Sequence, residues 1–299
     1  MDSEKKQFQF PFLSNFVIKL IAIIVMTIDH IGVVMQMVIG NNYDLAHYFR
    51  IIGRIAMPLF VFMIVEGVLH TKNFRRYILR LGILASIISF SMIVVEYVPI
   101  FDGLSLRGFG NIFIDLLLCA LTVFCLKHKK IYIKLLAAIP LGISILSFSA
   151  NCYEFGNNAI VHWYPFFIRC QYEYLPIIMS IFFYFAHYLK DITLKTNERL
   201  TGLKAENIDG TNISQIILNI WSIGGLILAG MIYYLVAIIL PNRMVYWDNQ
   251  LQTYSLLASL FILLYNGKRG YNKKWFQLGS YIYYPLHILI IYGIGLLFM

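Results

Sequence analysis

The segment Met26-Thr27-Ile28-Asp29-His30-Ile31-Gly32 lies in the middle of an apolar run that covers residues 16–40. A carboxylate and an imidazole stand side by side about halfway along a segment long enough for a helix to cross a bilayer. Ionisable groups at that depth cost about 3 kcal/mol of insertion free energy, so they usually face a protein interior and take part in function. The segment therefore predicts both a membrane-spanning helix and a candidate reactive centre.

The whole chain has the composition of a membrane protein. Of its 299 residues, 60% are hydrophobic and 13% are charged, and the mean hydropathy is +0.72. In soluble globular proteins only about half of the residues are apolar. Long uninterrupted runs such as residues 216–240 exclude a β-barrel, whose strands alternate in polarity. The sequence therefore predicts an all-α fold, a polytopic bundle of transmembrane helices that forms one domain over residues 1–299.

The apolar runs divide the chain into about nine spans. Eight and ten are the alternatives, because the eighth span is short and residues 160–168 suit a re-entrant segment. We find no internal repeat of the kind that many transporters show. The predicted spans are residues 16–40, 48–70, 76–98, 109–126, 131–149, 172–189, 213–240, 250–265 and 277–298.

The basic residues alternate from loop to loop. Of the 24 basic residues, two lie within spans, Lys19 and Arg54. Four lie in the odd-numbered loops or at their edges: Arg50, Arg107, Arg169 and Arg243. The N-terminal segment and the even-numbered loops hold 18 of the 24: Lys5, Lys6, Lys72, Arg75, Arg76, Arg80, Lys127, Lys129, Lys130, Lys134, Lys190, Lys195, Arg199, Lys204, Lys268, Arg269, Lys273 and Lys274. This asymmetry predicts a cell-membrane protein with a cytoplasmic N-terminus and an extracytoplasmic C-terminus. Because topology accounts for the net charge of +9, we expect a lipid bilayer as partner and no nucleic acid.

Two further expectations concern the first span and the four cysteines. The first span is too long for a cleavable signal peptide and lacks a small-residue cleavage site, so we expect it to remain as a helix. The four cysteines form no metal-spaced cluster, and we expect no metal. Cys119 and Cys125 lie in an apolar run, whereas Cys152 and Cys170 flank one loop and can form a disulfide if that loop is extracytoplasmic.

Asp29 and His30 need partners on other spans, because neighbouring residues of a helix point about 100° apart. The predicted topology places His30 and His287 near the midplane, with Arg54 in the outer third and Glu66 in the inner third. The candidate partners at membrane depth are Arg54, Glu66, Asn111, Asp115 and His287. An imidazole kept neutral by burial can take a proton from an attacking amine or hydroxyl, so His30 and His287 are the candidate general bases. The alternative is that these groups are polar contacts that fix helix packing.

The residues of the second span suit one wall of a polar cavity. Gly53 and Ala56 permit close helix approach, and Pro58 frees a carbonyl on the preceding turn. A kink at Pro58 with Arg54 on one side and Glu66 on the other suits such a wall. An ordinary proline kink explains Pro58 but not the two charges.

Two loops on the predicted cytoplasmic side suit an anionic ligand. Residues 70–76 (His-Thr-Lys-Asn-Phe-Arg-Arg) and 265–270 (Tyr-Asn-Gly-Lys-Arg-Gly) combine basic side chains with turn residues, and such turns can wrap a phosphate. The alternative is that these cations only set the topology. The candidate ligand-binding residues are Lys72, Arg75, Arg76, Lys268 and Arg269.

These segments together resemble the TraX family of membrane proteins, which is named for a pilin N-acetyltransferase. Two departures from the expected pattern are Met57 before the proline and Tyr284, where phenylalanine is usual. The matching stretches are residues 18–22, 28–32, 50–60, 66–67, 70–73, 77–81, 265–270 and 283–287, and the middle of the chain is less diagnostic.

The resemblance implies transfer of acetyl from acetyl-CoA to an amine or hydroxyl acceptor, such as a protein N-terminus or a sugar. His30 with Asp29 matches the intramembrane histidine of transmembrane acyltransferases that are similar in outline. His30 or His287 is then the base or the acyl carrier, and Arg54 or Asn111 stabilises the oxyanion. Two other classes stay open. A proton-coupled transporter or flippase would use Asp29, Glu66 and the histidines as a proton relay, and a scaffold of a secretion apparatus would use them only for packing.

Overall fold

The computed structural model describes residues 10–39, 44–98, 110–157, 159–202, 204–240 and 249–297. Helices dominate this part of the chain, and its β-structure is a single bridge between Leu13 and Tyr265. The all-α prediction is therefore confirmed. The helices are α1 (Asn15–Ile39), α2 (Asp44–Gly53), α3 (Ala56–His70), α4 (Phe74–Tyr97), α5 (Ile112–Lys127), α6 (Ile131–Leu135), α7 (Ala138–Asn157), η2 (Phe166–Ile168), α8 (Leu175–Thr201), α9 (Ala205–Ile208), α10 (Asn212–Ile239), α11 (Asn249–Thr253), η3 (Tyr254–Leu257), α12 (Ala258–Leu263) and α13 (Lys274–Leu296).

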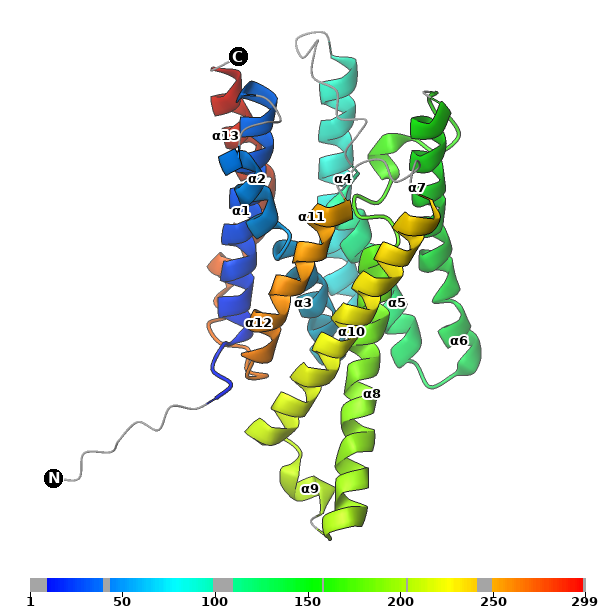
Figure 1. The fold of residues 1–299 in the computed structure, drawn as a ribbon, viewed down its shortest axis with the longest axis vertical. Coiled ribbons are helices and arrows are strands. Elements are labelled where there is room, and N and C mark those ends of the chain that lie inside the picture. Colours follow the sequence, from blue (N-terminus) through cyan, green and yellow to red (C-terminus); the bar gives the residue numbers. More distant parts are fainter. Residues whose placement is uncertain are drawn as a thin grey trace, which may run out of the picture.

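Seven helical segments of the described chain are long and apolar enough to cross a membrane, with α2–α3 and α6–α7 each counting as one. The other two predicted spans are shorter: α5 has 16 residues, and α11, η3 and α12 form an apolar segment over Leu251–Leu263. Residues 160–168 contain only the one-turn helix η2. In Figure 1, α1 begins at the lower end and α13 finishes at the upper end, which agrees with an odd number of passes.

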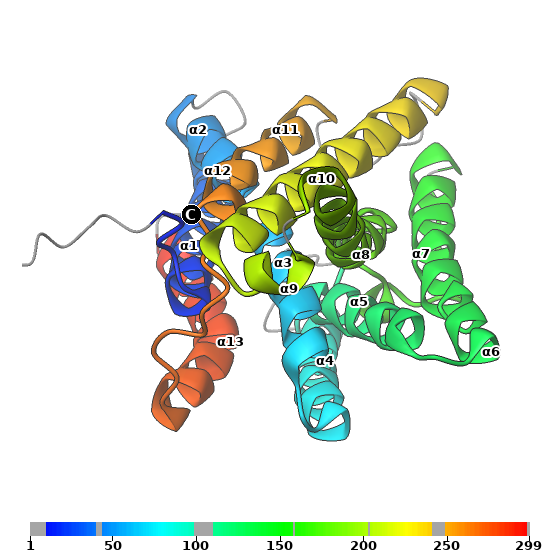
Figure 2. The same cartoon turned by 90° about the horizontal axis from the view of Figure 1, so that it is seen from below.

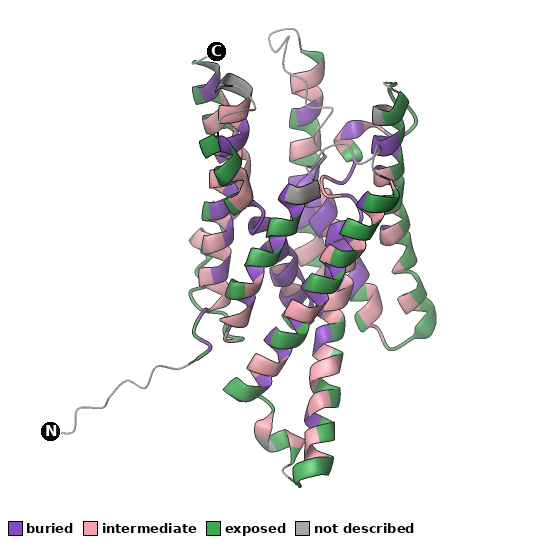
Figure 3. Cartoon of the chain, viewed as in Figure 1, coloured by how far each residue is buried: buried purple, intermediate pink, exposed green. Residues whose placement is uncertain are grey.

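Helix α3 lies in the middle of the bundle, with the other long helices around it (Figure 2). Ten of its fifteen residues are buried, and it packs against α1, α5 and α8. The buried residues gather at this central level, while the outward faces are exposed (Figure 3). Those faces present large apolar side chains such as Phe90 and Leu289, as expected of helices surrounded by lipid.

The second span breaks one turn earlier than predicted. The helix is interrupted at Arg54 and Ile55, and Pro58 occupies the first turn of α3. A proline there costs nothing, because the N–H groups of a first turn have no intrahelical partner. The break ends α2 at Gly53, where a methyl group would overlap the Asp29 side chain of α1. Close approach of α1 and α2 at Asp29 therefore requires glycine at this position.

The disulfide considered between Cys152 and Cys170 is not formed in the structure. Both side chains are buried. The backbone N–H of Cys170 instead donates to Ser147 Oγ at 3.1 Å, which attaches the loop before α8 to α7. Packing and hydrogen bonds thus hold this loop without a covalent link.

Candidate functional site

A pocket of about 740 Å³ runs inside the bundle between α1, α3, α4 and α13. One face of α1 lines it from Asn15 through Lys19 and Ile23 to His30. At 1.5 Å per residue, Asn15 and His30 are about 22 Å apart along the helix axis. The loops over residues 70–73 and 267–272 line the end of the same pocket that lies away from His30. We call this end of the pocket, which the basic loops line, the basic end or basic entrance, and the end at Asp29 and His30 the deep end.

His30 and His287 meet inside the bundle, as their predicted depth required. His30 Nδ1 lies 2.8 Å from His287 Nε2, and His287 Nδ1 lies 2.9 Å from the carbonyl oxygen of Tyr283. A carbonyl oxygen only accepts hydrogen bonds, so His287 Nδ1 carries a proton. In neutral His287 the Nε2 atom then accepts from Nδ1–H of His30, and Nε2 of His30 keeps its lone pair. The hydrogen-bond network thus assigns His30, which lines the pocket, a bare basic nitrogen.

Asp29 forms its ion pairs with two arginines rather than with His30. Arg54 Nη2 donates to Asp29 Oδ1 at 2.5 Å and Arg50 Nε donates to the same oxygen at 3.1 Å. Arg54 is only 1% exposed, and its guanidinium lies 6.0 Å from the Tyr172 ring centroid. Arg54, at the break between α2 and α3, is thus a buried contact partner of Asp29. Arg50, which the sequence placed at the edge of an outer loop, is a second partner.

Two other predicted site residues, Glu66 and Asn111, make their hydrogen bonds away from the pair formed by His30 and His287. Glu66 lines the pocket, but it binds His187 Nε2 at 2.9 Å and accepts from the Tyr265 hydroxyl at 3.2 Å. Asn111 caps α5: its Oδ1 accepts from Phe113 N, and its Nδ2 donates to Ala85 O at 2.8 Å. Asn111 is not among the residues that line the pocket, so we leave it out of the proposed chemistry.

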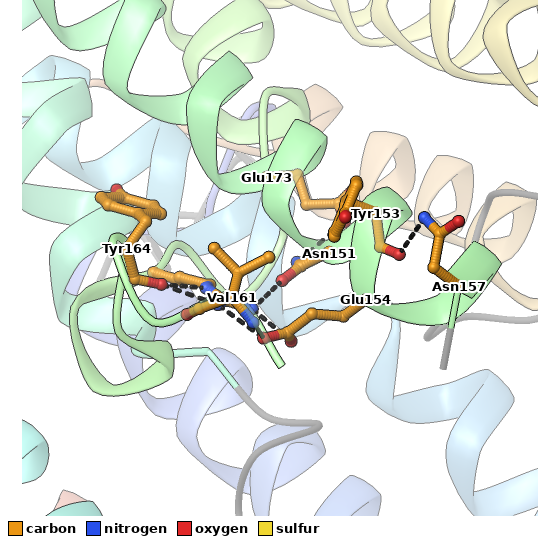
Figure 4. Close-up of polar contacts among 8 residues, drawn as sticks. Asn151, Tyr153, Glu154, Asn157, Val161, Tyr164 and Glu173 are labelled. Carbon is orange, nitrogen blue, oxygen red and sulfur yellow. Dashed lines mark hydrogen bonds and ion pairs between the residues drawn. The ribbon is translucent and has the colours of Figure 1, made fainter. Parts of the chain in front are cut away.

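The loop before α8 closes the pocket near His30. Gln171 and Tyr172 line the pocket, and their backbone N–H groups donate to the buried Asp115 carboxylate at 2.7 and 3.3 Å. The same loop is attached to α7, and Figure 4 shows Val161 and Tyr164 of the loop beside Asn151 and Glu154 of α7. Arg169 donates to both oxygens of Glu154 at 2.6 and 2.9 Å. This pair holds in place the loop that carries Gln171 and Tyr172.

Of the basic residues predicted to bind phosphate, three line the pocket: Lys72, Arg76 and Arg269. Arg75 and Lys268 are not part of its lining. Both glycines of the 265–270 turn adopt the left-handed backbone conformation that favours glycine, with φ of 71° at Gly267 and 69° at Gly270. Leu13 N donates to Leu264 O at 2.8 Å, which attaches this turn to the start of α1.

Sequence reasoning missed two lining cations, Arg80 and Lys19. Lys19 was counted only as a basic residue within a span. A signal for it existed, because Lys19 and His30 are eleven residues apart and an α-helix completes just over three whole turns over eleven residues. Both side chains therefore share the face of α1 that lines the pocket.

Fold and site define a class: a bundle of helices apolar enough to cross a membrane, with an internal pocket between a basic entrance and a histidine pair. A family model described as "TraX protein" matches residues 14–205, more than half of the chain. The chain belongs to the TraX family. Over 167 residues it is 30% identical to "Probable fimbrial assembly protein FimC, serogroup H1" of Dichelobacter nodosus. That match covers 51% of this chain and 63% of the relative, so the chain spans less than two thirds of that protein's length. No solved structure matches.

Proposed function

We propose that this protein is an integral-membrane acyltransferase that moves acetyl from acetyl-CoA to an amine or hydroxyl acceptor, with its basic end in the cytoplasm and its C-terminus outside. The observation that carries the proposal is the pocket itself. It joins a basic entrance lined by Lys72, Arg76 and Arg269 to His30, whose second ring nitrogen is bound to His287. Phosphates suit the entrance, and an acyl thioester suits the buried imidazole.

The proposed chemistry uses His30 as a general base. Nε2 of His30 takes the acceptor proton while the acceptor nitrogen or oxygen bonds to the thioester carbonyl carbon. The C–S bond then breaks, and the CoA thiolate receives the proton from His30. His287 and the Tyr283 carbonyl hold the required tautomer. Tyr283 also lines the pocket, and its hydroxyl, which donates to Thr27 Oγ1 at 2.8 Å, is our candidate donor to the oxyanion once it turns from Thr27.

Arg54 and Glu66 take positioning roles in this proposal. Arg54 binds Asp29 rather than lining the pocket, and Glu66 binds Tyr265 beside the basic entrance. The name of the Dichelobacter relative connects that protein with fimbrial assembly. This supports a protein N-terminus as one acceptor class to test, beside sugars and other hydroxyl compounds.

The test is consumption of acetyl-CoA by the purified protein in detergent, where no gradient exists. Release of the CoA thiol is measured with peptides that carry a free N-terminus and with sugar acceptors. We expect His30→Ala to lower the rate about 10²–10⁴-fold. His47→Ala is the matched control, because His47 is exposed on α2 and does not line the pocket.

Two results would contradict the proposal. One is full activity in a folded His30→Ala protein. The other is wild-type protein that neither binds CoA nor consumes the thioester with any acceptor class. The second result would favour the transporter, whose proton relay needs no thioester.

A further inference from the structure

Lys19 is a largely enclosed cation without a carboxylate partner in the described part of the chain. Its ammonium lies 5.4 Å from the ring centroid of Phe276 and 5.5 Å from that of Tyr281, both on α13. All three residues line the pocket. Aromatic faces attract a cation but do not neutralise it.

A cation inside an apolar bundle is costly unless an anion accompanies it. Arg76 and Arg80 of α4 line the same pocket, so they add to its positive charge. Glu66 is the acidic lining residue toward the basic end, and its carboxylate binds His187 and Tyr265. A ligand therefore has to supply the anion that this part of the pocket lacks.

The position of Lys19 relative to His30 identifies which anion fits. The eleven residues between them correspond to about 16 Å along the α1 axis. In a CoA thioester, the arm between the diphosphate and the sulfur has about as many backbone bonds as four residues of extended polypeptide, which span roughly 14 Å. The flexible lysine side chain readily covers the small difference.

We propose, on the basis of the proposed function, that Lys19 binds the diphosphate of the acyl-CoA donor inside the bundle. The extended arm then places the thioester carbonyl at His30. Lys72, Arg76 and Arg269 lie nearer the entrance and are left for the 3′-phosphate and the adenosine end. Lys19 is thus a donor-binding residue that fixes how deep the thioester enters.

The experiment compares two donors, acetyl-CoA and acetyl-pantetheine, since the second lacks the diphosphate. In Lys19→Met, we expect KM for acetyl-CoA to rise at least tenfold while kcat stays within twofold. The kinetics with acetyl-pantetheine should equal those of the wild type. Lys19→Arg should keep most of the affinity. The matched control is Lys130→Met, since Lys130 also lies over an aromatic ring, 5.6 Å from Tyr132, but outside the pocket.

A measurement on the wild-type protein guards against misfolding of the variant. ADP should protect Lys19 from an amine-labelling reagent, read by mass spectrometry, whereas adenosine should not. The inference is overturned if Lys19→Met leaves KM for acetyl-CoA unchanged, if it impairs both donors equally, or if ADP gives no protection. The proposed function fails separately, when the wild-type protein consumes neither donor.

Discussion

Charged side chains are arranged in opposite ways at the two ends of the pocket. At the deep end, Arg54 and Arg50 both bind Asp29, and Arg169, two residues before the lining residue Gln171, binds Glu154. At the basic end, Lys72, Arg76, Arg80 and Arg269 line the pocket, and no carboxylate in the described ranges pairs with them. The deep charges connect helices to each other, whereas the entrance charges are available to a ligand.

The physical reason lies in desolvation. A buried guanidinium needs a carboxylate, because removing either partner leaves an uncompensated charge in an apolar surrounding. A cation at the mouth of the pocket stays partly hydrated and needs none. The comparison therefore predicts that substitutions at the deep end mainly affect stability and that those at the basic end mainly affect ligand affinity.

The largest effect is expected for Arg54→Met. The substitution leaves Asp29 with Arg50 as its remaining ion-pair partner, and we expect a loss of about 3 kcal/mol of unfolding free energy. Unfolding by SDS titration of the protein in mixed micelles measures it. Asp29→Asn combined with Arg54→Met should cost less than the sum of the two single substitutions, because both substitutions remove the same ion pair. If the unfolding free energy of Arg54→Met alone is within 0.5 kcal/mol of the wild type, the pair between Asp29 and Arg54 does not stabilise the bundle.

Glu173 sharpens the comparison, because it is a buried carboxyl with a neutral partner. It is 8% exposed, lies just before α8, and accepts from Asn151 Nδ2 at 3.1 Å. Burial raises the pKa of Glu173 from 4.5 to about 7. An unfolded chain loses this proton near pH 4.5 and the folded protein near pH 7. The free energy of unfolding should therefore fall as the pH rises between these values and stay level above.

The pH-dependent loss from Glu173 amounts to about 3 kcal/mol at most, since one pKa unit corresponds to about 1.4 kcal/mol. Glu173→Gln keeps the shape and removes the charge, so it should be more stable than the wild type at pH 8 and similar at pH 4.5. Glu198→Gln, on the last turns of α8, is a control that should leave the pH profile as it is. An unchanged pH profile in Glu173→Gln would assign the slope to other groups.

The sequence sufficed for the features that depend on depth and periodicity. Apolar runs predicted the helices, and the topology placed His30 and His287 at one level, where they are 2.8 Å apart. It also placed Glu66 on the wall of a polar cavity, and Glu66 lines the pocket. These predictions hold because burial in a bilayer depends mainly on distance along a helix.

The features that sequence reasoning missed depend on which helices lie side by side. Arg50 looked like a loop-edge cation, because nothing in the order of residues shows that α2 folds back along α1 to reach Asp29. Asn111 looked catalytic by its depth, yet it caps α5. That Lys19 lies in the pocket against two aromatic rings of α13 depends on the packing of α1 and α13. Arg107 and Arg243, counted among the outer arginines, lie outside the described residues.

The smallest effect on stability is expected at the entrance, for Lys72→Gln and Arg269→Gln. Both side chains are exposed, so each variant should unfold within 0.5 kcal/mol of the wild type. Their affinity for CoA, measured by calorimetry, should nevertheless fall several-fold, and the double variant should lose part of the salt dependence of binding.

Lys268→Gln is the control beside them, because Lys268 does not line the pocket. If Lys268→Gln weakens binding as much as Arg269→Gln does, a diffuse positive field rather than a shaped site attracts the donor. The contrast between the two ends of the pocket would then rest on the deep pairs alone.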